Sequence, residues 1–159
     1  MKKAIYPGSF DPITKGHLDI IRRGSKSFDK VIVAVLINSE KQGLFSIEER
    51  VSLIRKATFG IDNVEIISFE GLLVDYMEKN HISIILKGLR NSKDFEYELQ
   101  MANVNKILGN EIETIFMISN PENSYISSSM VKEVCKLGGN ISGLVPSEVE
   151  SIIKKKIMG

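Results

Sequence analysis

The stretch from Val31 to Ile37 is the feature that most restricts what this chain can fold into. Its residues, VIVAVLI, are all apolar and most are β-branched. A strand with one face in water alternates apolar and polar residues, whereas a strand covered on both faces is apolar throughout. The run therefore predicts a strand inside a parallel sheet that has helices on both faces.

Apolar runs alternate with amphipathic stretches along the rest of the chain. The expected strands are 3–6, 30–37, 64–69, 82–87 and 113–118, and the expected helices are 16–27, 47–58, 72–79, 95–108, 128–136 and 147–157. Ser46 followed by Glu49 forms a capping box, and Pro146-Ser147-Glu148 is typical of a helix start. The alternation predicts an α/β fold, a single doubly wound, Rossmann-like domain with a five-stranded parallel sheet.

Length and composition limit the remaining choices. The 159 residues fit one domain, 1–159, large enough to bury roughly 70% of the unfolded surface. A net charge of +1 gives no basis for bulk binding to nucleic acid or to a membrane surface. One cysteine, Cys135, excludes an internal disulfide, and no long apolar segment follows Met1-Lys2-Lys3. We therefore expect a soluble, cytoplasmic protein without a signal peptide or a membrane span.

Residues 5–17, IYPGSFDPITKGH, lead from the first expected strand into the first expected helix. The strand runs into a Pro-Gly turn, Ser9 follows, and Thr14-Lys15-Gly16-His17 begins the helix. A strand, a glycine turn and a helix N-terminus form an anion site, because free backbone N–H groups and the helix dipole point the same way. A histidine there can donate to phosphate oxygens, so the segment indicates nucleotide chemistry.

Polar residues also follow three other expected strands, where ligands bind in doubly wound folds. They are Asn38-Ser39-Glu40-Lys41, Lys87-Gly88-Leu89-Arg90, and a loop from Ser119 to Tyr125 followed by Ile126-Ser127-Ser128-Ser129. Each group alone has a plain explanation: a solvated loop lysine, surface charges, a helix N-cap and, for His17, a surface or capping histidine. Independent placement would scatter these groups over both ends of the sheet. Their convergence on one edge predicts a phosphate-binding site.

Several other site types are excluded. The chain has no Cys/His cluster with zinc spacing. Neither a Walker A motif nor G-x-G-x-x-G follows the first strand, which argues against P-loop enzymes and dinucleotide dehydrogenases. His81, Cys135 and the run Lys154-Lys155-Lys156 are expected to be structural or solvated, and no residue is assigned as a metal ligand.

The motifs resemble those of a known family. Thr14-Lys15-Gly16-His17 is similar to the T/H-x-G-H signature of the nucleotidyltransferase superfamily, and 126–129 is similar to its I-S-S-[ST] signature. Segments 6–12 (YPGSFDP), 45–50 (FSIEER), 87–90 (KGLR) and 94–98 (DFEYE) resemble phosphopantetheine adenylyltransferases, with matching spacing along the whole chain. Ser9 stands where threonine is frequent and keeps the hydroxyl. Lys87 stands where arginine is frequent and loses the two-pronged phosphate contact.

The resemblance implies a reaction. ATP and 4′-phosphopantetheine would give dephospho-coenzyme A and pyrophosphate, with Mg²⁺ as cofactor, in the penultimate step of coenzyme A synthesis. The acceptor phosphate would attack the α-phosphorus in line, and no strong general base is needed because that phosphate is already anionic. The enzyme must instead bring two polyanions together and stabilise the charge of the transition state. The resemblance also implies a homohexamer, which the sequence supports only through apolar residues on its helices.

The resemblance assigns roles to individual residues, with His17, Lys41 and Arg90 as the catalytic set. His17 would stabilise the transition state at the α-phosphate, Lys41 and Lys87 would hold the acceptor phosphate, and Arg90 would clamp the departing pyrophosphate. The residues expected to contact ATP are Ser9, Phe10, His17, Gly88, Leu89, Arg90, Glu98, Asn123, Ser124, Tyr125, Ile126, Ser127, Ser128 and Ser129. Those expected to contact phosphopantetheine are Ser9, Lys41, Leu72, Leu73, Lys87, Met101, Asn105 and Met130. For Leu73 and Met101, core packing is an equally good explanation.

Two alternatives stay open. A sibling transferase, such as a glycerol-3-phosphate cytidylyltransferase or a nicotinamide mononucleotide adenylyltransferase, would share the first motif but use another acceptor. Lys41 and the 94–98 segment favour phosphopantetheine. A nucleotide-binding regulator on the same fold is the second alternative, because fold does not fix function. The intact set of His17, Lys87, Arg90 and the serines argues against it.

Overall fold

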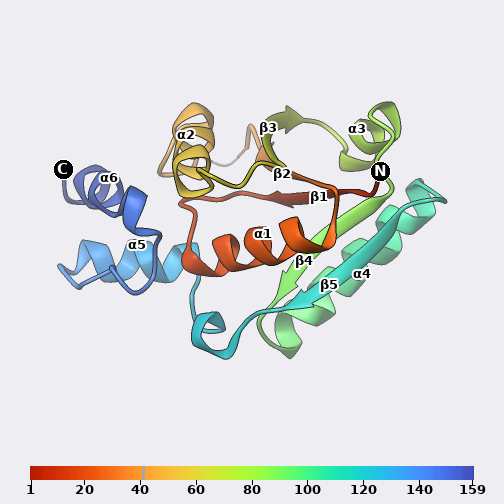
Figure 1. The fold of residues 1–159 in the computed structure, drawn as a ribbon. Helices are drawn as coiled ribbons and strands as arrows, with labels where there is room; N and C mark the ends of the chain where they lie inside the picture. Colours follow the sequence, from red (N-terminus) through yellow and green to blue (C-terminus); the bar gives the residue numbers. More distant parts are fainter. Residues whose placement is uncertain (41) are drawn as a thin grey trace.

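The computed structural model describes residues 1–40 and 42–159. Five parallel strands form one sheet in the order β3-β2-β1-β4-β5 (Figure 1). The strands are β1 (Lys3–Gly8), β2 (Lys30–Ile37), β3 (Val64–Glu70), β4 (Ile84–Leu89) and β5 (Glu113–Ile118). The helices are α1 (Lys15–Ser27), α2 (Ile47–Ala57), α3 (Leu73–Lys79), α4 (Ser92–Leu108), α5 (Ser128–Lys136) and α6 (Ser147–Met158), with a 3₁₀ turn at Pro121–Asn123. The predicted five-stranded parallel sheet is confirmed.

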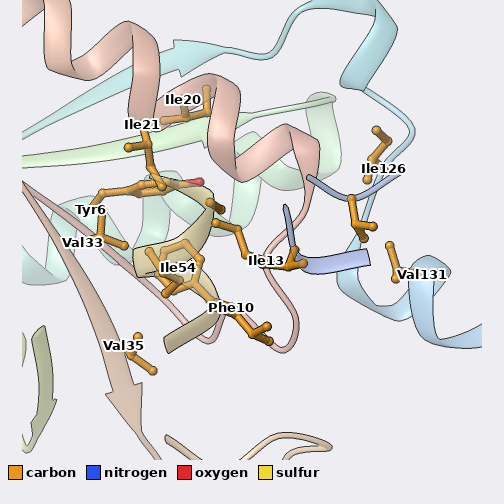
Figure 2. Packing of buried hydrophobic residues seen from close by; sticks show 14 of the residues in the cluster. Tyr6, Phe10, Ile13, Ile20, Ile21, Val33, Val35, Ile54, Ile126 and Val131 are labelled. Atoms are coloured by element: carbon orange, nitrogen blue, oxygen red, sulfur yellow. The ribbon is translucent and has the colours of Figure 1, made fainter. Parts of the chain in front are cut away.

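Helices cover both faces of this sheet, which explains the uninterrupted apolar run of β2. Val33 and Val35 lie in the larger cluster with residues of α1 and α2, such as Ile21 and Ile54 (Figure 2). The alternate residues Ile32 and Ala34 belong to the cluster on the opposite face, which includes Val74 and Met77 of α3. Because successive side chains point to opposite faces, each strand residue needs an apolar partner layer. The doubly wound architecture is confirmed.

The direction of strand addition reverses at β1. From β1 the chain adds β2 and β3 on one side, then crosses over to add β4 and β5 on the other side (Figure 1). The loops after β1 and β4 therefore leave neighbouring strands in different directions. In open α/β sheets, ligands bind in the crevice that forms at such a reversal.

Two strands, β1 and β4, end two residues later than the sequence predicted, and both ends lie at this crevice. Pro7 and Gly8 pair with Ala34 and Val35, so the predicted Pro-Gly turn is wrong. The chain turns instead at Phe10, a buried residue with the left-handed φ of 47°. β4 covers Ile84–Leu89 rather than 82–87, because its ladder with β5 continues past the apolar run. Residues 88 and 89 thus lie within the strand and not in the loop after it.

The helix borders agree closely with the prediction, apart from α4. This helix begins at Ser92, three residues before the predicted start, because Asn91 accepts a hydrogen bond from the Asp94 N–H and caps it. The capping box of Ser46 and Glu49 is confirmed at the start of α2. In residues 1–40 and 42–159, no helix combines the length and the apolar content needed to cross a membrane.

Candidate active site

A cavity of about 320 Å³ opens at the carboxyl ends of β1 and β4. Its lining comes from the end of β1 and the turn after it, the start of α1, the end of β4, the first turns of α4 and the start of α5. The predicted site residues that it brings together are Ser9, Phe10, His17, Lys87, Gly88, Arg90, Glu98, Ile126, Ser127 and Ser128. The predicted convergence on one edge of the sheet is confirmed for these residues.

The imidazole of His17 is held by the start of its own helix. Thr14 Oγ1 accepts a hydrogen bond from the His17 N–H at 3.3 Å, and His17 Nδ1 accepts one from the Thr14 N–H at 3.1 Å. A backbone N–H can only donate, so Nδ1 must be unprotonated. The proton of the neutral ring is then on Nε2. His17 is a capping histidine, as one alternative had it, and the cap fixes which nitrogen can donate to a ligand.

His17 stays neutral near pH 7. Burial lowers its pKa, and the charges of Arg90 and Lys87 lower it further, to about 4. The ring also packs against Phe10, with 4.9 Å between the two centroids. A neutral imidazole can donate from Nε2 without adding a third positive charge beside the two cations.

Arg90 joins two segments that are far apart in the sequence. Its Nε and Nη2 donate to the carboxylate of Asp94 in α4 at 2.9 and 3.2 Å. Its Nη1 donates to the carbonyl oxygen of Ile126, just before α5, at 3.0 Å. These contacts leave the guanidinium at the cavity with its plane fixed, which suits a planar contact to phosphate oxygens.

Lys87 reaches the cavity from the end of β4. Its Nζ lies 3.3 Å from Glu98 Oε1 and 3.5 Å from the carbonyl oxygen of Pro7. The side chains of Lys87 and Glu98 are only 22% and 19% exposed, so Lys87 is not an ordinary surface charge. The pair brings a carboxylate from α4 next to an ammonium from β4 in the cavity lining.

The serines at the start of α5 have structural partners. Ser127 is the N-cap, and its hydroxyl accepts a hydrogen bond from the Met130 N–H at 3.1 Å. Ser128 Oγ donates to the carbonyl oxygen of Pro12 at 2.7 Å. The N-cap explanation therefore holds for Ser127, while Ser128 ties α5 to the loop after β1.

Other predicted residues are not among those that line the cavity. For ATP these are Leu89, Asn123, Ser124, Tyr125 and Ser129, and for phosphopantetheine they are Leu72, Leu73, Met101, Asn105 and Met130. Leu73 packs against the smaller cluster, as its core-packing alternative predicted. That alternative is wrong for Met101, which is 41% exposed on α4. Lys41 lies outside the described residues, and all of these contact assignments stay predictions.

The cavity is also lined by residues that were not assigned to the site from the sequence. They are Tyr6, Pro7, Gly8, Thr14, Gly16, Ile20, Asp94 and Ser119. Most of them belong to the motif segments that carry the resemblance. Their place in these motifs is the sequence signal by which they could have been assigned to the site. Asp94 is the most informative, because its contact with Arg90 needs α4 to begin before the predicted start.

Comparisons with known proteins show the family to which the chain belongs. Residues 5–134 match the model of the cytidylyltransferase-like family. The chain is 62% identical over 157 residues to a phosphopantetheine adenylyltransferase of Clostridium novyi (strain NT), covering 99% of this chain and 98% of that protein. It is 59% identical over 156 residues to one of Clostridium botulinum (strain Alaska E43 / Type E3), covering 98% of each.

A solved structure, a bifunctional NMN adenylyltransferase/ADP ribose pyrophosphatase from Francisella tularensis, shares the fold. Its TM-score is 0.74 at 16% identity, covering 99% of this chain and 50% of that chain. The fold is thus found beyond the close relatives, whereas the motifs around the cavity lie within segments matched at about 60% identity. The chain belongs to the phosphopantetheine adenylyltransferases, within the cytidylyltransferase-like family.

Proposed function

We propose that this chain transfers the adenylyl group of ATP to 4′-phosphopantetheine, giving dephospho-coenzyme A and pyrophosphate. The main observation that supports adenylyl transfer is a single cavity in which His17, a neutral hydrogen-bond donor, lies beside Lys87 and Arg90. Positive side chains and an N–H donor are what a transfer between two phosphates needs. Membership of the family over nearly the whole chain supports the choice of acceptor.

The reaction makes one P–O bond and breaks another. An oxygen of the acceptor phosphate attacks the α-phosphorus of ATP, and the bond from that phosphorus to the bridging oxygen of the β-phosphate breaks. The electron pair leaves with pyrophosphate. Because the nucleophile is already an anion, the site needs no strong base. Its task is to position the two phosphates and to stabilise the charge that develops between them.

Each group of the cavity has a part in this task. His17 Nε2–H donates to an oxygen of the α-phosphate, where negative charge increases in the transition state. Lys87 binds the acceptor phosphate as a single point charge, together with Lys41. Arg90 binds the β- and γ-phosphates, which leave as pyrophosphate.

We propose that Mg²⁺ enters with ATP as part of the nucleotide substrate. In the part of the chain that the structure describes, no group of three His, Cys, Asp or Glu side chains is arranged to hold a metal ion. Mg²⁺ in nucleotide sites takes most of its ligands from substrate phosphates and water, with one or two carboxylates at most. The triphosphate of ATP supplies such oxygen ligands.

We also propose that the protein works in the cytoplasm as a homohexamer, with no nucleic-acid or membrane partner. Large apolar side chains are exposed along α4 and on the edge strand β5, among them Ile107 at 82% and Ile118 at 73%. Self-association would remove this apolar surface from water. The net charge of +1 supports the absence of a nucleic-acid partner.

Pyrophosphate release is the test of the proposed function. The purified chain is incubated with Mg²⁺ and ATP, with and without 4′-phosphopantetheine, and we expect release only when the acceptor is present. CTP, glycerol 3-phosphate and nicotinamide mononucleotide complete the panel. Release with another donor or acceptor would assign the chain to a sibling activity. ATP binding without any release would favour the nucleotide-binding regulator.

A further inference from the structure

A buried polar cluster lies beside the cavity but does not line it. Its centre is the ion pair of Asp11 and Arg50, which are only 8% and 7% exposed. Asp11 follows the turn after β1, and Arg50 lies on α2. The two charges have no direct part in the chemistry, because neither is among the cavity-lining residues. Burying two charges costs free energy unless their remaining hydrogen-bonding groups also have partners. The contacts of the pair therefore indicate its role.

The carboxylate of Asp11 binds the end of the loop between β2 and α2, residues 38–46. Its Oδ2 accepts a hydrogen bond from the Leu44 N–H, and its Oδ1 accepts one from the Phe45 N–H, both at 2.9 Å. Lys132 of α5 approaches the same carboxylate, with Nζ 3.4 Å from Oδ2. Burial alone would raise the pKa of Asp11, but the two N–H donors and the two cations lower it below its ordinary value. Asp11 therefore remains an anion that links two loops and a helix.

The guanidinium of Arg50 binds the same two segments from the other side. Its Nε donates to the carbonyl oxygen of Phe45 at 2.9 Å and lies 3.4 Å from Asp11 Oδ1. Its Nη1 donates to the carbonyl oxygen of Ser9 at 3.3 Å. Ser9 itself lines the cavity. One side chain thus joins the turn after β1 to the last part of the β2–α2 loop.

Gly43 shows how closely the loop is fitted to this pair. A Cβ atom at position 43 would lie 1.5 Å from Arg50 Nη2 and 2.9 Å from Asp11 Oδ2. No side chain can occupy that space unless the guanidinium or the loop moves. Position 43 therefore requires glycine for contact with the pair, although the residue itself is exposed.

We propose that Asp11 and Arg50 are positioning residues that hold the β2–α2 loop against the Ser9 turn, and so align the acceptor side of the site with the nucleotide side. The inference rests on the proposed function, in which Lys41, two positions before Gly43 in the sequence, binds the acceptor phosphate. The hydrogen bonds of the pair reach backbone atoms of these two segments: Ser9 O, Leu44 N, Phe45 N and Phe45 O. Of these two segments, one carries Ser9 of the cavity lining and the other follows Lys41 in the sequence.

The test compares three variants of the full-length chain. Asp11→Asn removes the charge and one of the two strong acceptors, Arg50→Lys keeps the charge but cannot bridge Ser9 and Phe45, and Gly43→Ala displaces the loop without removing a polar group. For each we expect the KM for phosphopantetheine to rise about tenfold or more, while the KM for ATP changes less than about twofold. Among the expected ATP contacts, only Ser9 and Phe10 belong to the turn that the pair holds. The others come from α1, β4, α4 and the segment that leads into α5.

Binding and stability measurements make the outcome decisive. Calorimetric titration should likewise show weaker binding of phosphopantetheine and nearly unchanged binding of ATP. The control is Glu150→Gln, which breaks the ion pair with Lys154 on α6 and should leave the KM and the dissociation constant for both substrates at their wild-type values. Gly43→Ala removes no buried charge. If Asp11→Asn does not fold, the binding of the two substrates to Gly43→Ala therefore tests the positioning role. Equal weakening of both substrates, or unchanged binding of both, would overturn the positioning role. Wild-type protein that binds ATP but neither binds nor uses phosphopantetheine would instead overturn the proposed function.

Discussion

The two nitrogens of the His17 ring have separate uses. Nδ1 accepts the hydrogen bond of the helix cap, and this leaves Nε2–H as the donor that the transfer reaction needs. The place of His17 at the start of a helix could be predicted from the T-K-G-H motif. The tautomer could not, because it follows from a backbone hydrogen bond that exists only in the folded chain.

Replacing His17 tests its role as a donor in the transition state. His17→Ala should lower kcat by about a hundredfold or more, with little change in ATP affinity, because the donor acts most strongly when charge has developed on the α-phosphate. Steady-state kinetics with saturating phosphopantetheine would measure both quantities. A variant that keeps near-normal kcat would rule out the proposed role.

The low pKa of His17 also predicts how stability depends on pH. In the unfolded chain the ring takes up a proton near its ordinary pKa of 6.5, whereas in the folded protein it does so only near 4. Between these values the unfolded state binds more protons, so the free energy of unfolding should decrease as the pH falls from about 6.5 towards 4, by at most about 3 kcal/mol.

Urea unfolding at about pH 7.5 and about pH 5 would measure this decrease. His17→Gln has an amide that can still accept the capping hydrogen bond, but it has no titrating ring. The free energy of unfolding of this variant should therefore differ less between the two pH values than that of the wild type. An equal pH dependence in the variant and the wild type would show that His17 is not the group responsible.

At the level of elements, the position of α1 over β4 depends on a glycine in the strand. A Cβ atom at Gly88 would lie 2.9 Å from Cγ1 of Ile20, so only glycine allows the helix to lie this close to the strand. The family resemblance implied a contact between Gly88 and ATP. In the structure Gly88 lines the cavity and also sets the distance between two elements that carry His17 and Lys87.

Adding one methyl group at this position tests the close packing. Gly88→Ala should lower the free energy of unfolding by about 1–3 kcal/mol, because Ile20 is fully buried and has little room to move. Gly143→Ala is the matched control, since a Cβ atom there meets nothing within 4 Å. Chemical denaturation of both variants would measure the difference, and equal stability would contradict the packing argument.

At the scale of the whole molecule, the reversal of strand order beside β1 creates the site. β1 and β4 are neighbours in the sheet although about 80 residues separate Pro7 from Lys87, whose Nζ approaches the carbonyl oxygen of Pro7. Alternating strands and helices predicted a doubly wound sheet and therefore one ligand edge. The strand order, and with it which strand ends face each other, is decided by packing.

The apolar surface of α4 and β5 gives a prediction about assembly. We expect the protein to have the mass of a homohexamer, and Ile107→Glu to reduce that mass by introducing a charge into a buried contact. Phe59→Ser is the control, because Phe59 is 93% exposed just after α2 and away from this surface. Light scattering after size-exclusion chromatography would measure all three masses. A monomeric wild-type protein would reject the proposal.

The sequence by itself determined the class of fold and most of the groups around the cavity. The periods of apolar residues set the strands and helices, and the motifs indicated the polar residues at the strand ends, such as His17 and Arg90. Only the tertiary structure decided the strand order, the extension of β4, the pairing of Lys87 with Glu98 and the cluster of Asp11 and Arg50. The physical reason is that periodicity and motifs are local properties. These other features depend on hydrogen bonds and contacts between residues that are distant in sequence, which only packing brings together.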